Sequence, residues 1–348
     1  MMSIARVPRA VVSLGVAALL FSMASSAPAV TIDWVTVGNP GNTADTTTYG
    51  AVAYDFRIGK YEVTIGQYTA FLNAADPNGT NPNGIYNSFM ASNLNIAGIL
   101  FTAGSSAGAK YSVMNNGGDS SNRPISYVSW FDAARFANWM HNGQGAGDTE
   151  TGAYTLNGAT SGTAPAKNPG AQFYIPTENE WYKAAFYAPS LNGGAGGYYT
   201  YATQSNTAPG NQIGTSLNQA NSAAGGLYSV TQSNSYSASQ NYLTEVGAFT
   251  NSASFYGTFD QSGNQFEWNA LNGTASSILG WRGGGWNTGA TILLGSGFGF
   301  TQPTSDEGDI LTFRLAAPAA VPEPSTCAMA LAGLACGGYL VRRRRHRA

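Results

Sequence analysis

The residue types that most often carry chemistry are scarce in this chain of 348 residues. Its two cysteines, Cys327 and Cys336, both lie close to the C-terminus, and the only histidine outside that tail is His141. A metal site that needs two imidazoles, or an imidazole with a thiolate, is therefore excluded from the rest of the chain. Disulfides are excluded there as well. The candidates that remain are carboxylates, which suit hard cations, and aromatic side chains.

One aromatic candidate is formed by Trp281, Arg282 and Trp286. Aromatic faces pack well on sugar rings, so these residues are candidates for a ligand-binding platform. A tryptophan beside several glycines is also typical of a turn in a protein core. The sequence leaves both interpretations open and favours the core.

Three segments that could position such residues are predicted to be helices. Each begins with a capping box, in which a threonine or serine and the residue three positions later bond each other's backbone N–H groups. In the second box an aspartate stands where glutamate or glutamine is usual. Apolar residues follow each box at helical spacing, and we expect their aromatic members to pack in the core. The three boxes are Thr64–Gln67, Ser129–Asp132 and Thr177–Glu180.

The rest of the chain favours short strands and long packed loops. Glycine accounts for 44 residues, and Gly, Asn, Ser and Thr are densest from Ser190 to Asn241. Such a composition forms turns rather than long regular elements. Aromatic residues recur within these loops, which argues for packing rather than disorder. The predicted strands are Trp34–Val37, Phe56–Tyr61, Phe173–Ile175, Tyr198–Tyr201 and Leu311–Leu315.

The N-terminal end has the three parts of a secretory signal peptide. Arg6 and Arg9 form a basic region, and Val11–Phe21 is an apolar stretch of signal-peptide length. Ala27-Pro28-Ala29 then offers an A-x-A cleavage site. We predict cleavage after Ala29 and assign residues 1–29 to the signal peptide.

The C-terminal end also has three parts in a fixed order. Pro322-Glu323-Pro324 cannot extend a helix or join the centre of a sheet. The apolar stretch Cys327–Val341 spans only about 23 Å as a helix, which is short for a membrane. The arginines at 342–345 then hold that end in the cytoplasm. This segment, residues 319–348, resembles the PEP-CTERM sorting signal of Gram-negative bacteria.

The resemblance implies a route and two partners. The chain would cross the inner membrane through the secretion translocase, with a transient transmembrane anchor at its C-terminus. An exosortase would then cut near Pro322, Glu323 or Pro324 and release the domain to the cell surface or the extracellular matrix. An anchor that is never cut is the alternative. Both place the domain outside the cytoplasm.

Removing both ends changes the charge of the protein. The whole chain has a net charge of −2, but residues 30–321 keep 9 basic and 17 acidic residues and a net charge of −8. An acidic surface disfavours nucleic acids and anionic membranes, which are bound through Lys and Arg. It is compatible with cations and neutral glycans.

Six landmarks occur in one order between the two ends. Together they resemble the formylglycine-generating enzyme family, also called sulfatase-modifying factors, over about Trp34 to Leu315. The resemblance implies an irregular, loop-rich α+β fold, related to C-type lectins, with about three helices and short strands over residues 30–318. The landmarks are Gly59–Thr64, Arg123–Trp130, Ile175–Trp181, Gly263–Trp268, Arg282–Trp286 and Phe313–Leu315.

The resemblance also identifies what this chain lacks. Active members hold copper with two cysteine thiolates that follow the Arg-Gly-Gly-Ser-Trp-like motif, because copper(I) prefers soft ligands. Alignment without gaps from Arg282–Trp286 places Thr288 and Leu293 at these positions. No cysteine elsewhere in residues 30–318 could replace them. Copper is therefore not expected, formylglycine generation by this mechanism is not expected, and we assign no catalytic residue.

A calcium site is what the resemblance retains. Gly263–Trp268 matches the family segment that wraps calcium with backbone carbonyls and one carboxylate, ligands that suit a hard cation. The match implies ligation by the Glu267 side chain and by the carbonyls of Ser262, Gly263 and Gln265. Asn221 matches a second calcium site more weakly. The alternative for Glu267 is a buried ion pair with Arg282 or Arg314.

Three functions remain open. The first, which we favour, is a calcium-stabilised module that binds a glycan, such as an exopolysaccharide, or a surface protein. The second is an enzyme of this oxidoreductase family with unrecognised chemistry, whose candidate acids Glu178, Glu180 and Asp260 look like cap or turn residues. The third is a structural matrix protein.

Overall fold

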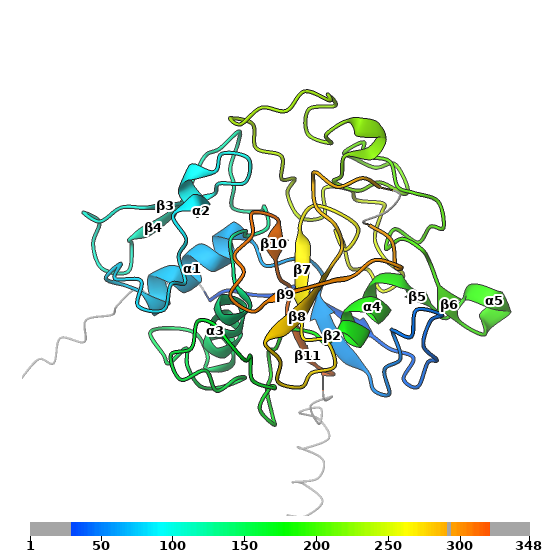
Figure 1. Ribbon diagram of the computed structural model, residues 1–348, viewed down its shortest axis with the longest axis horizontal. Helices are drawn as coiled ribbons and strands as arrows, with labels where there is room; N and C mark the ends of the chain where they lie inside the picture. Colours follow the sequence, from blue (N-terminus) through cyan, green and yellow to red (C-terminus); the bar gives the residue numbers. More distant parts are fainter. Residues whose placement is uncertain (1–28, 291–293, 321–348) are drawn as a thin grey trace, which may run out of the picture.

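Turns and loops connect many short elements in the computed structural model, which describes residues 29–290 and 294–320 (Figure 1). No helix within these two ranges is long and apolar enough to cross a membrane. The predicted transmembrane stretch Cys327–Val341 lies outside them. The elements are β1 (Trp34–Val37), β2 (Phe56–Gly59), α1 (Ile65–Ala75), α2 (Phe89–Ser92), β3 (Ile99–Phe101), β4 (Tyr111–Val113), α3 (Trp130–His141), α4 (Glu178–Phe186), β5 (Tyr187–Ala188), α5 (Leu191–Gly194), β6 (Gly197–Tyr198), the 3-10 turn Ala224–Gly226, β7 (Phe266–Asn269), β8 (Ile278–Arg282), β9 (Phe300–Pro303), β10 (Leu311–Thr312) and β11 (Ala316–Pro318).

The three predicted helices are α1, α3 and α4, and each has its capping box. Asp132 serves in the second box as a glutamate would, since its Oδ2 accepts from the backbone N–H of Ser129 at 2.9 Å and from the Ser129 hydroxyl at 2.6 Å. The short helices α2 and α5 have no side-chain cap and were not expected. Capping chemistry thus identified the helices of more than one turn.

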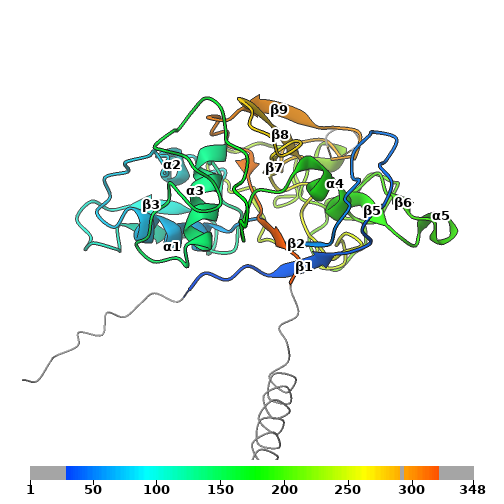
Figure 2. The same ribbon diagram turned by 90° about the horizontal axis from the view of Figure 1, so that it is seen from below.

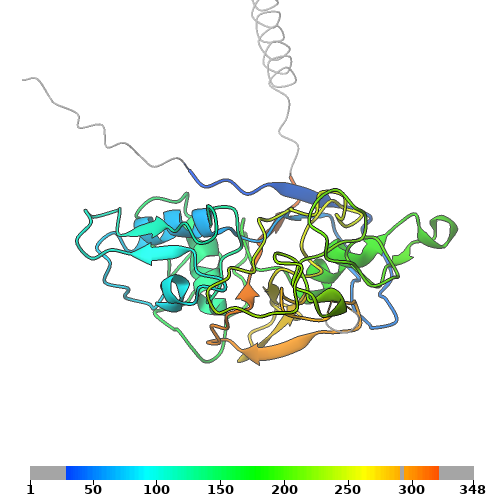
Figure 3. The same ribbon diagram turned by 90° about the horizontal axis from the view of Figure 1, so that it is seen from above.

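Two larger sheets organise the fold, while β3 with β4 and β5 with β6 form two-stranded sheets. One has the strand order β1-β2-β11, and the other has the order β10-β7-β8-β9, in which β10 pairs with β7 in parallel. Figures 2 and 3 show β1 on one side of the molecule and β9 on the opposite side. The described chain ends, Ala29 and Ala320, lie on the side of β1 (Figure 2).

Four strand predictions differ from the structure. The predicted strand Phe56–Tyr61 ends at Gly59. Phe173–Ile175 is not a strand and has only an isolated bridge between Tyr174 and Ala316. Only Gly197–Tyr198 is paired where Tyr198–Tyr201 was expected. The predicted strand Leu311–Leu315 stops at Thr312, because the carbonyls of Phe313 and Leu315 accept from Val63 and Gly59 outside that sheet. The chain there leaves the sheet of β7 and joins the sheet of β2.

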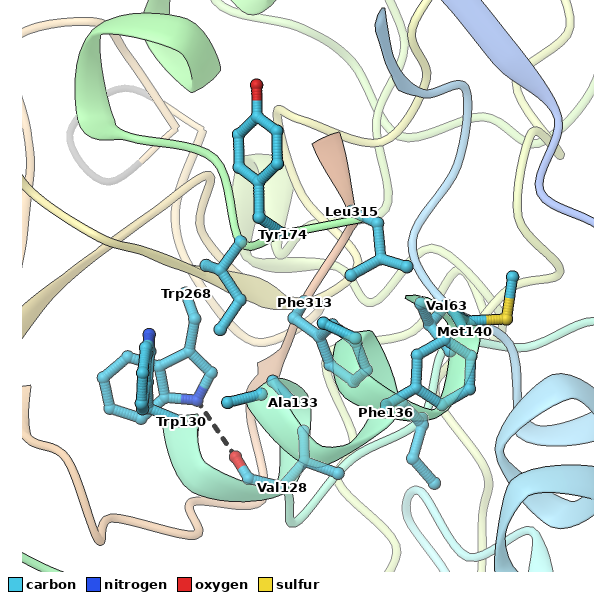
Figure 4. Packing of buried hydrophobic residues seen from close by; sticks show 14 of the residues in the cluster. Val63, Val128, Trp130, Ala133, Phe136, Met140, Tyr174, Trp268, Phe313 and Leu315 are labelled. Carbon is cyan, nitrogen blue, oxygen red and sulfur yellow. Dashed lines mark hydrogen bonds between the residues drawn. The ribbon is translucent and has the colours of Figure 1, made fainter. Parts of the chain in front are cut away.

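The main core lies between α1, α3 and the two sheets (Figure 4). Phe136 of α3 meets the ring of Phe313 edge-on with ring centroids 5.5 Å apart. The indole N–H of Trp268 donates to the carbonyl of Val128 at 3.0 Å, which joins β7 to the segment before α3. The helix aromatics therefore pack in the core, and the expected loop-rich α+β fold with about three helices is confirmed.

Candidate functional site

The turn before β7 holds the residues predicted to bind calcium. Gly263 has a φ of 126°, and a Cβ added to it would lie 2.4 Å from the carbonyl oxygen of Asn221. Only glycine fits such a conformation at such a distance. The backbone N–H of Asn264 donates to the same Asn221 carbonyl at 2.9 Å, and the Asn221 amide donates to Asn264 Oδ1 at 2.9 Å. The structure thus brings Asn221, predicted from a separate part of the sequence, against this turn.

Several buried oxygens at this turn accept no hydrogen bond from the described residues. They include the side-chain oxygens Asn221 Oδ1 and Gln265 Oε1. The backbone carbonyls of Ser262, Gly263 and Gln265 likewise receive none from residues 29–290 or 294–320. Buried acceptors without donors are rare and point to a bound group. Amide and carbonyl oxygens are ligands of Ca²⁺, so these residues fit a hard cation.

Glu267 is the one predicted ligand whose oxygens are already engaged. Its carboxylate is fully buried and accepts from Arg314 Nε at 2.5 Å, from Arg314 Nη2 at 2.5 Å and from Trp181 Nε1 at 2.8 Å. This is the ion pair that the sequence left open as the alternative. Calcium ligation by Glu267 stays a prediction, and an ion there would share the carboxylate with Arg314. No group of three or more His, Cys, Asp or Glu side chains within the described ranges could hold a metal.

Arg314 connects three segments of chain. It is fully buried and donates to the carbonyl oxygens of Gly59 at 2.9 Å, Lys60 at 3.3 Å and Phe259 at 2.8 Å, besides Glu267. A guanidinium has five N–H donors in a rigid fork, which suits this task. The ion pair therefore fixes the loops on both sides of β7.

Two further acids lie near Arg314, and sequence reasoning did not assign a role to Glu62. Burial raises the pKa of Glu62 well above its ordinary value, Asp260 and Glu267 raise it further, and Arg314 opposes them. Burial also raises the pKa of Asp260 to about 6, although its Oδ2 accepts from the backbone N–H of Gly247 at 2.6 Å. The signal for Glu62 was an acidic residue three positions after the end of β2 and directly before an apolar valine.

Arg282 lies in a second buried ion pair. Its exposed fraction is 3%, and its Nε donates to Glu178 Oε1 at 2.7 Å. Nη1 donates to the carbonyls of Ser296 at 3.1 Å and Phe298 at 2.8 Å. Its guanidinium also lies 4.7 Å from the ring centroid of Tyr49. All these contacts are within the protein, so Arg282 holds the segment after β8 against α4.

The two tryptophans of the predicted platform lie apart from each other. Trp286 is 4% exposed and stacks on Tyr242, with ring centroids 4.6 Å apart and planes 5° from parallel. Trp281 is partly exposed and packs on Phe266 at 4.3 Å and on Phe300 at 5.3 Å. Of the three platform residues, only Trp281 presents surface to a ligand.

The positions of the family cysteines show no reactive group in the described part. Thr288 is 7% exposed, and its hydroxyl donates to the carbonyl of Gly285 at 2.8 Å and accepts from the Gly285 N–H at 3.0 Å. The hydroxyl therefore closes a turn. Leu293 lies outside the described residues, as do Pro322, Glu323 and Pro324 of the predicted exosortase site. Ala29, the predicted signal-peptide cleavage position, is exposed.

The acids considered for an enzyme have structural partners. Glu178 pairs with Arg282, as described above. Glu180 Oε2 accepts from the Thr177 N–H at 2.8 Å in the capping box, and its Oε1 accepts from the hydroxyls of Tyr54 at 3.0 Å and Tyr174 at 2.9 Å. Asp260 is partly exposed and lies in a bend with a φ of 63°.

Comparison with known proteins agrees with the family resemblance. The family model described as "Sulfatase-modifying factor enzyme 1-like domain" matches residues 30–318, and the model of the PEP-CTERM protein-sorting motif matches residues 320–345. No curated protein matches the chain.

Among solved structures, the crystal structure of CarF is 20% identical, with a TM-score of 0.50, and the alignment covers 83% of this chain and 99% of CarF. Variable protein 1 of Treponema denticola is 16% identical, with a TM-score of 0.44 and coverage of 84% and 97%. PvdO from Pseudomonas aeruginosa is 19% identical, with a TM-score of 0.41 and coverage of 82% and 92%. The likeness to CarF concerns the fold alone.

The match over residues 30–318 includes both buried ion pairs and the turn before β7. The sorting motif is the substrate signal of an exosortase and implies export and membrane-associated sorting in a Gram-negative bacterium. The chain belongs to the family of sulfatase-modifying factor enzyme 1-like domains and carries a C-terminal PEP-CTERM sorting motif.

Proposed function

We propose that this protein is displayed at the cell surface or in the extracellular matrix as a calcium-stabilised module that binds a glycan or a protein, without formylglycine-generating activity. The observation that carries the proposal is the state of Thr288. A hydroxyl occupies the place of a family thiolate and is bonded within its own turn. Residues 30–318 contain no cysteine that could hold copper(I).

Calcium would act on stability in this proposal. Asn221 Oδ1, Gln265 Oε1 and the neighbouring carbonyls would hold the ion and join the turn before β7 to the loop of Asn221. Since these oxygens have no donors in the described structure, an ion there would replace the water they lose on folding. The ion would supply no redox chemistry.

The orientation of the chain supports display. The described C-terminal end at Ala320 lies on the side of β1, while β8 and β9 lie on the opposite side (Figure 2). While the sorting segment still anchors the chain, the face of β8 and β9 would point away from the membrane. Trp281 and the 39% exposed Phe300 offer apolar surface there.

A binding experiment with the exported protein tests the proposal. The protein is applied to a panel of bacterial exopolysaccharides and other glycans, in calcium and in a chelator. We expect saturable binding that the chelator weakens, and a melting temperature that calcium raises. A free calcium concentration of about 100 times Kd should add about 2.7 kcal/mol to the free energy of unfolding.

Asn221→Ala is the matched variant for the calcium part. It should remove most of the calcium-dependent rise in melting temperature. A domain that stays folded but binds no glycan or surface protein would refute the binding function and favour the matrix protein. Turnover of any substrate would establish an enzyme instead.

A further inference from the structure

Glu62 is a buried carboxylate without a partner. Only 2% of its surface is exposed, and neither of its oxygens accepts a hydrogen bond from the described residues. Arg314, the cation whose charge opposes the rise in the pKa of Glu62, is committed to Glu267 and to three backbone carbonyls. A carboxylate buried in this way is costly unless something donates to it. Glu62 therefore marks a place where a donor from outside the fold would be favourable.

A pocket that opens to the surface lies beside Glu62, and because both carboxylate oxygens are buried, the side chain must turn towards this pocket to meet a ligand. Glu62 lines a cavity of about 390 Å³ together with Asp33, Tyr61, Asn122 and Glu245. Asp33 and Glu245 are exposed, so they lie towards its mouth, whereas Glu62 lies at its inner end. No lysine or arginine is among the described residues that line it. The volume is within the range of small-molecule sites and far exceeds that of a bare ion.

Hydrogen bonds within the protein hold two parts of the pocket wall in place. The Gln67 side chain donates to the carbonyl of Thr31 at 2.8 Å and accepts from the Thr64 N–H at 2.9 Å. The N–H of Val246 donates to the carbonyl of Asn122 at 2.8 Å. A pocket with preorganised walls and unused acceptors selects a ligand rich in donors.

The positions of the acids decide between a metal and an organic cation. No set of three acidic, histidine or cysteine side chains within the described ranges converges closely enough for a metal. Three carboxylates at different depths suit a longer molecule whose charged end reaches the innermost one. An ammonium brings three N–H donors and no acceptor, which complements a carboxylate that has no donor.

We propose that this pocket binds the primary ammonium group of a small polar ligand, with Glu62 as its inner anchor and Asp33 and Glu245 at its mouth. The ammonium can come from an amino sugar of a matrix glycan or from a lysine side chain of a partner protein. This inference rests on the proposed binding function and gives it a site and a ligand class.

The test titrates four probes into the exported protein, with calorimetry as the readout. Glucosamine and the lysine analogue N-acetyl-lysine amide carry the ammonium, while N-acetylglucosamine and the same lysine analogue acetylated on its side chain lack it. We expect the free amines to bind at least tenfold more tightly than their acetylated partners. Preference for glucosamine would identify the glycan source, and preference for the lysine analogue would identify the protein source.

Glu62→Gln and Glu245→Gln are the paired variants. Glu62→Gln should weaken amine binding at least tenfold without lowering the melting temperature, because it removes an unpaired buried carboxylate. Glu245→Gln, at an exposed position, should weaken binding several-fold and leave the fold unchanged. If Glu62→Gln fails to fold, the double variant Asp33→Asn/Glu245→Gln replaces it, with the same expected weakening of amine binding.

Three results would overturn this inference. One is equal binding of free and acetylated probes. Another is amine binding that neither Glu62→Gln nor the double variant weakens. The third is competition by calcium alone, which would assign the pocket to a metal. Glycan binding that persists unchanged in Glu62→Gln would reject this site but leave the proposed binding function in place. Amine binding without any binding of a glycan or protein would reject the proposed binding function but not this site.

Discussion

Removal of Arg314 should destabilise the protein far more than removal of its ion-pair partner. Arg314→Met leaves Glu267 buried without a counter-charge and also removes the positive charge that lowers the pKa of Glu62 and Asp260. The loss of one member of a buried pair costs about 3–5 kcal/mol. Three backbone carbonyls lose their donor as well. Because a domain is stable by only about 5–15 kcal/mol, this variant should be close to unfolded.

Glu267→Gln should cost less, on the order of 1–3 kcal/mol. The glutamine keeps an oxygen for the guanidinium, and Arg314 keeps Asp260 and Glu62 as nearby acids. Their pKa values, raised in the wild-type protein, would fall as they take over the counter-charge. The order of the two variants therefore follows from three acids surrounding one arginine.

Urea denaturation of the exported protein measures both free energies of unfolding. Arg57→Met is the matched control, because Arg57 is partly exposed, donates to the carbonyl of Pro318 at 3.0 Å and has no acidic partner within the described ranges. It should cost less than about 1 kcal/mol. If Arg314→Met costs no more than Glu267→Gln, the three acids do not depend on Arg314 and the reasoning fails.

Three further predictions concern stability. Burial raises the pKa of Asp132 to about 7 and that of Asp260 to about 6. Between pH 8 and pH 5 the folded state therefore binds more protons than the unfolded chain. The free energy of unfolding should rise by a few kcal/mol as the pH falls from 8 to 5. Urea denaturation midpoints from pH 8 to pH 5 measure this increase in stability, which Asp132→Asn should reduce. A loss of stability towards pH 5 would contradict the raised pKa values. Gly263→Ala should cost at least about 2 kcal/mol in the same assay, because its φ of 126° and the Asn221 carbonyl leave no room for a Cβ, whereas Gly104→Ala, whose Cβ meets nothing within 4 Å, should be close to neutral. Trp286→Ala should cost about 3–5 kcal/mol as a core residue; unchanged stability with lost glycan binding would place Trp286 on a binding surface instead.

Local chemistry explains what the sequence could predict about the fold. Each of α1, α3 and α4 begins at a capping box, whose bonds join residues only three positions apart. Such signals are readable in a single chain. The strands of the sheet around β7 carry no such signal, since β7 pairs with β10 through a long excursion of the chain. Their existence depends on neighbours that the local sequence does not specify.

The candidate site divides in the same way. The turn at Gly263 and the alternative pairing of Glu267 with an arginine could be stated in advance because they belong to named motifs. The sequence could not show that Glu267 pairs with Arg314 rather than with Arg282, because Glu267 and Arg314 are 47 positions apart. The unpaired carboxylate of Glu62 was missed for a related reason. Whether it has a hydrogen-bond partner depends on side chains and backbone from other parts of the chain.

Two of the buried arginines, Arg282 and Arg314, help to explain how so irregular a chain holds together without a disulfide in residues 30–318. Loops that lack a sheet ladder leave many backbone carbonyls in need of donors. Arg314 supplies donors to carbonyls of two separate segments and Arg282 to two carbonyls after β8, and each arginine is held by a carboxylate from another element. Each therefore connects distant loops as a cross-link would, through an ion pair and hydrogen bonds rather than a covalent bond. The loops of β7 and β8 should therefore be sensitive to the loss of Glu267 or Glu178 rather than to redox conditions.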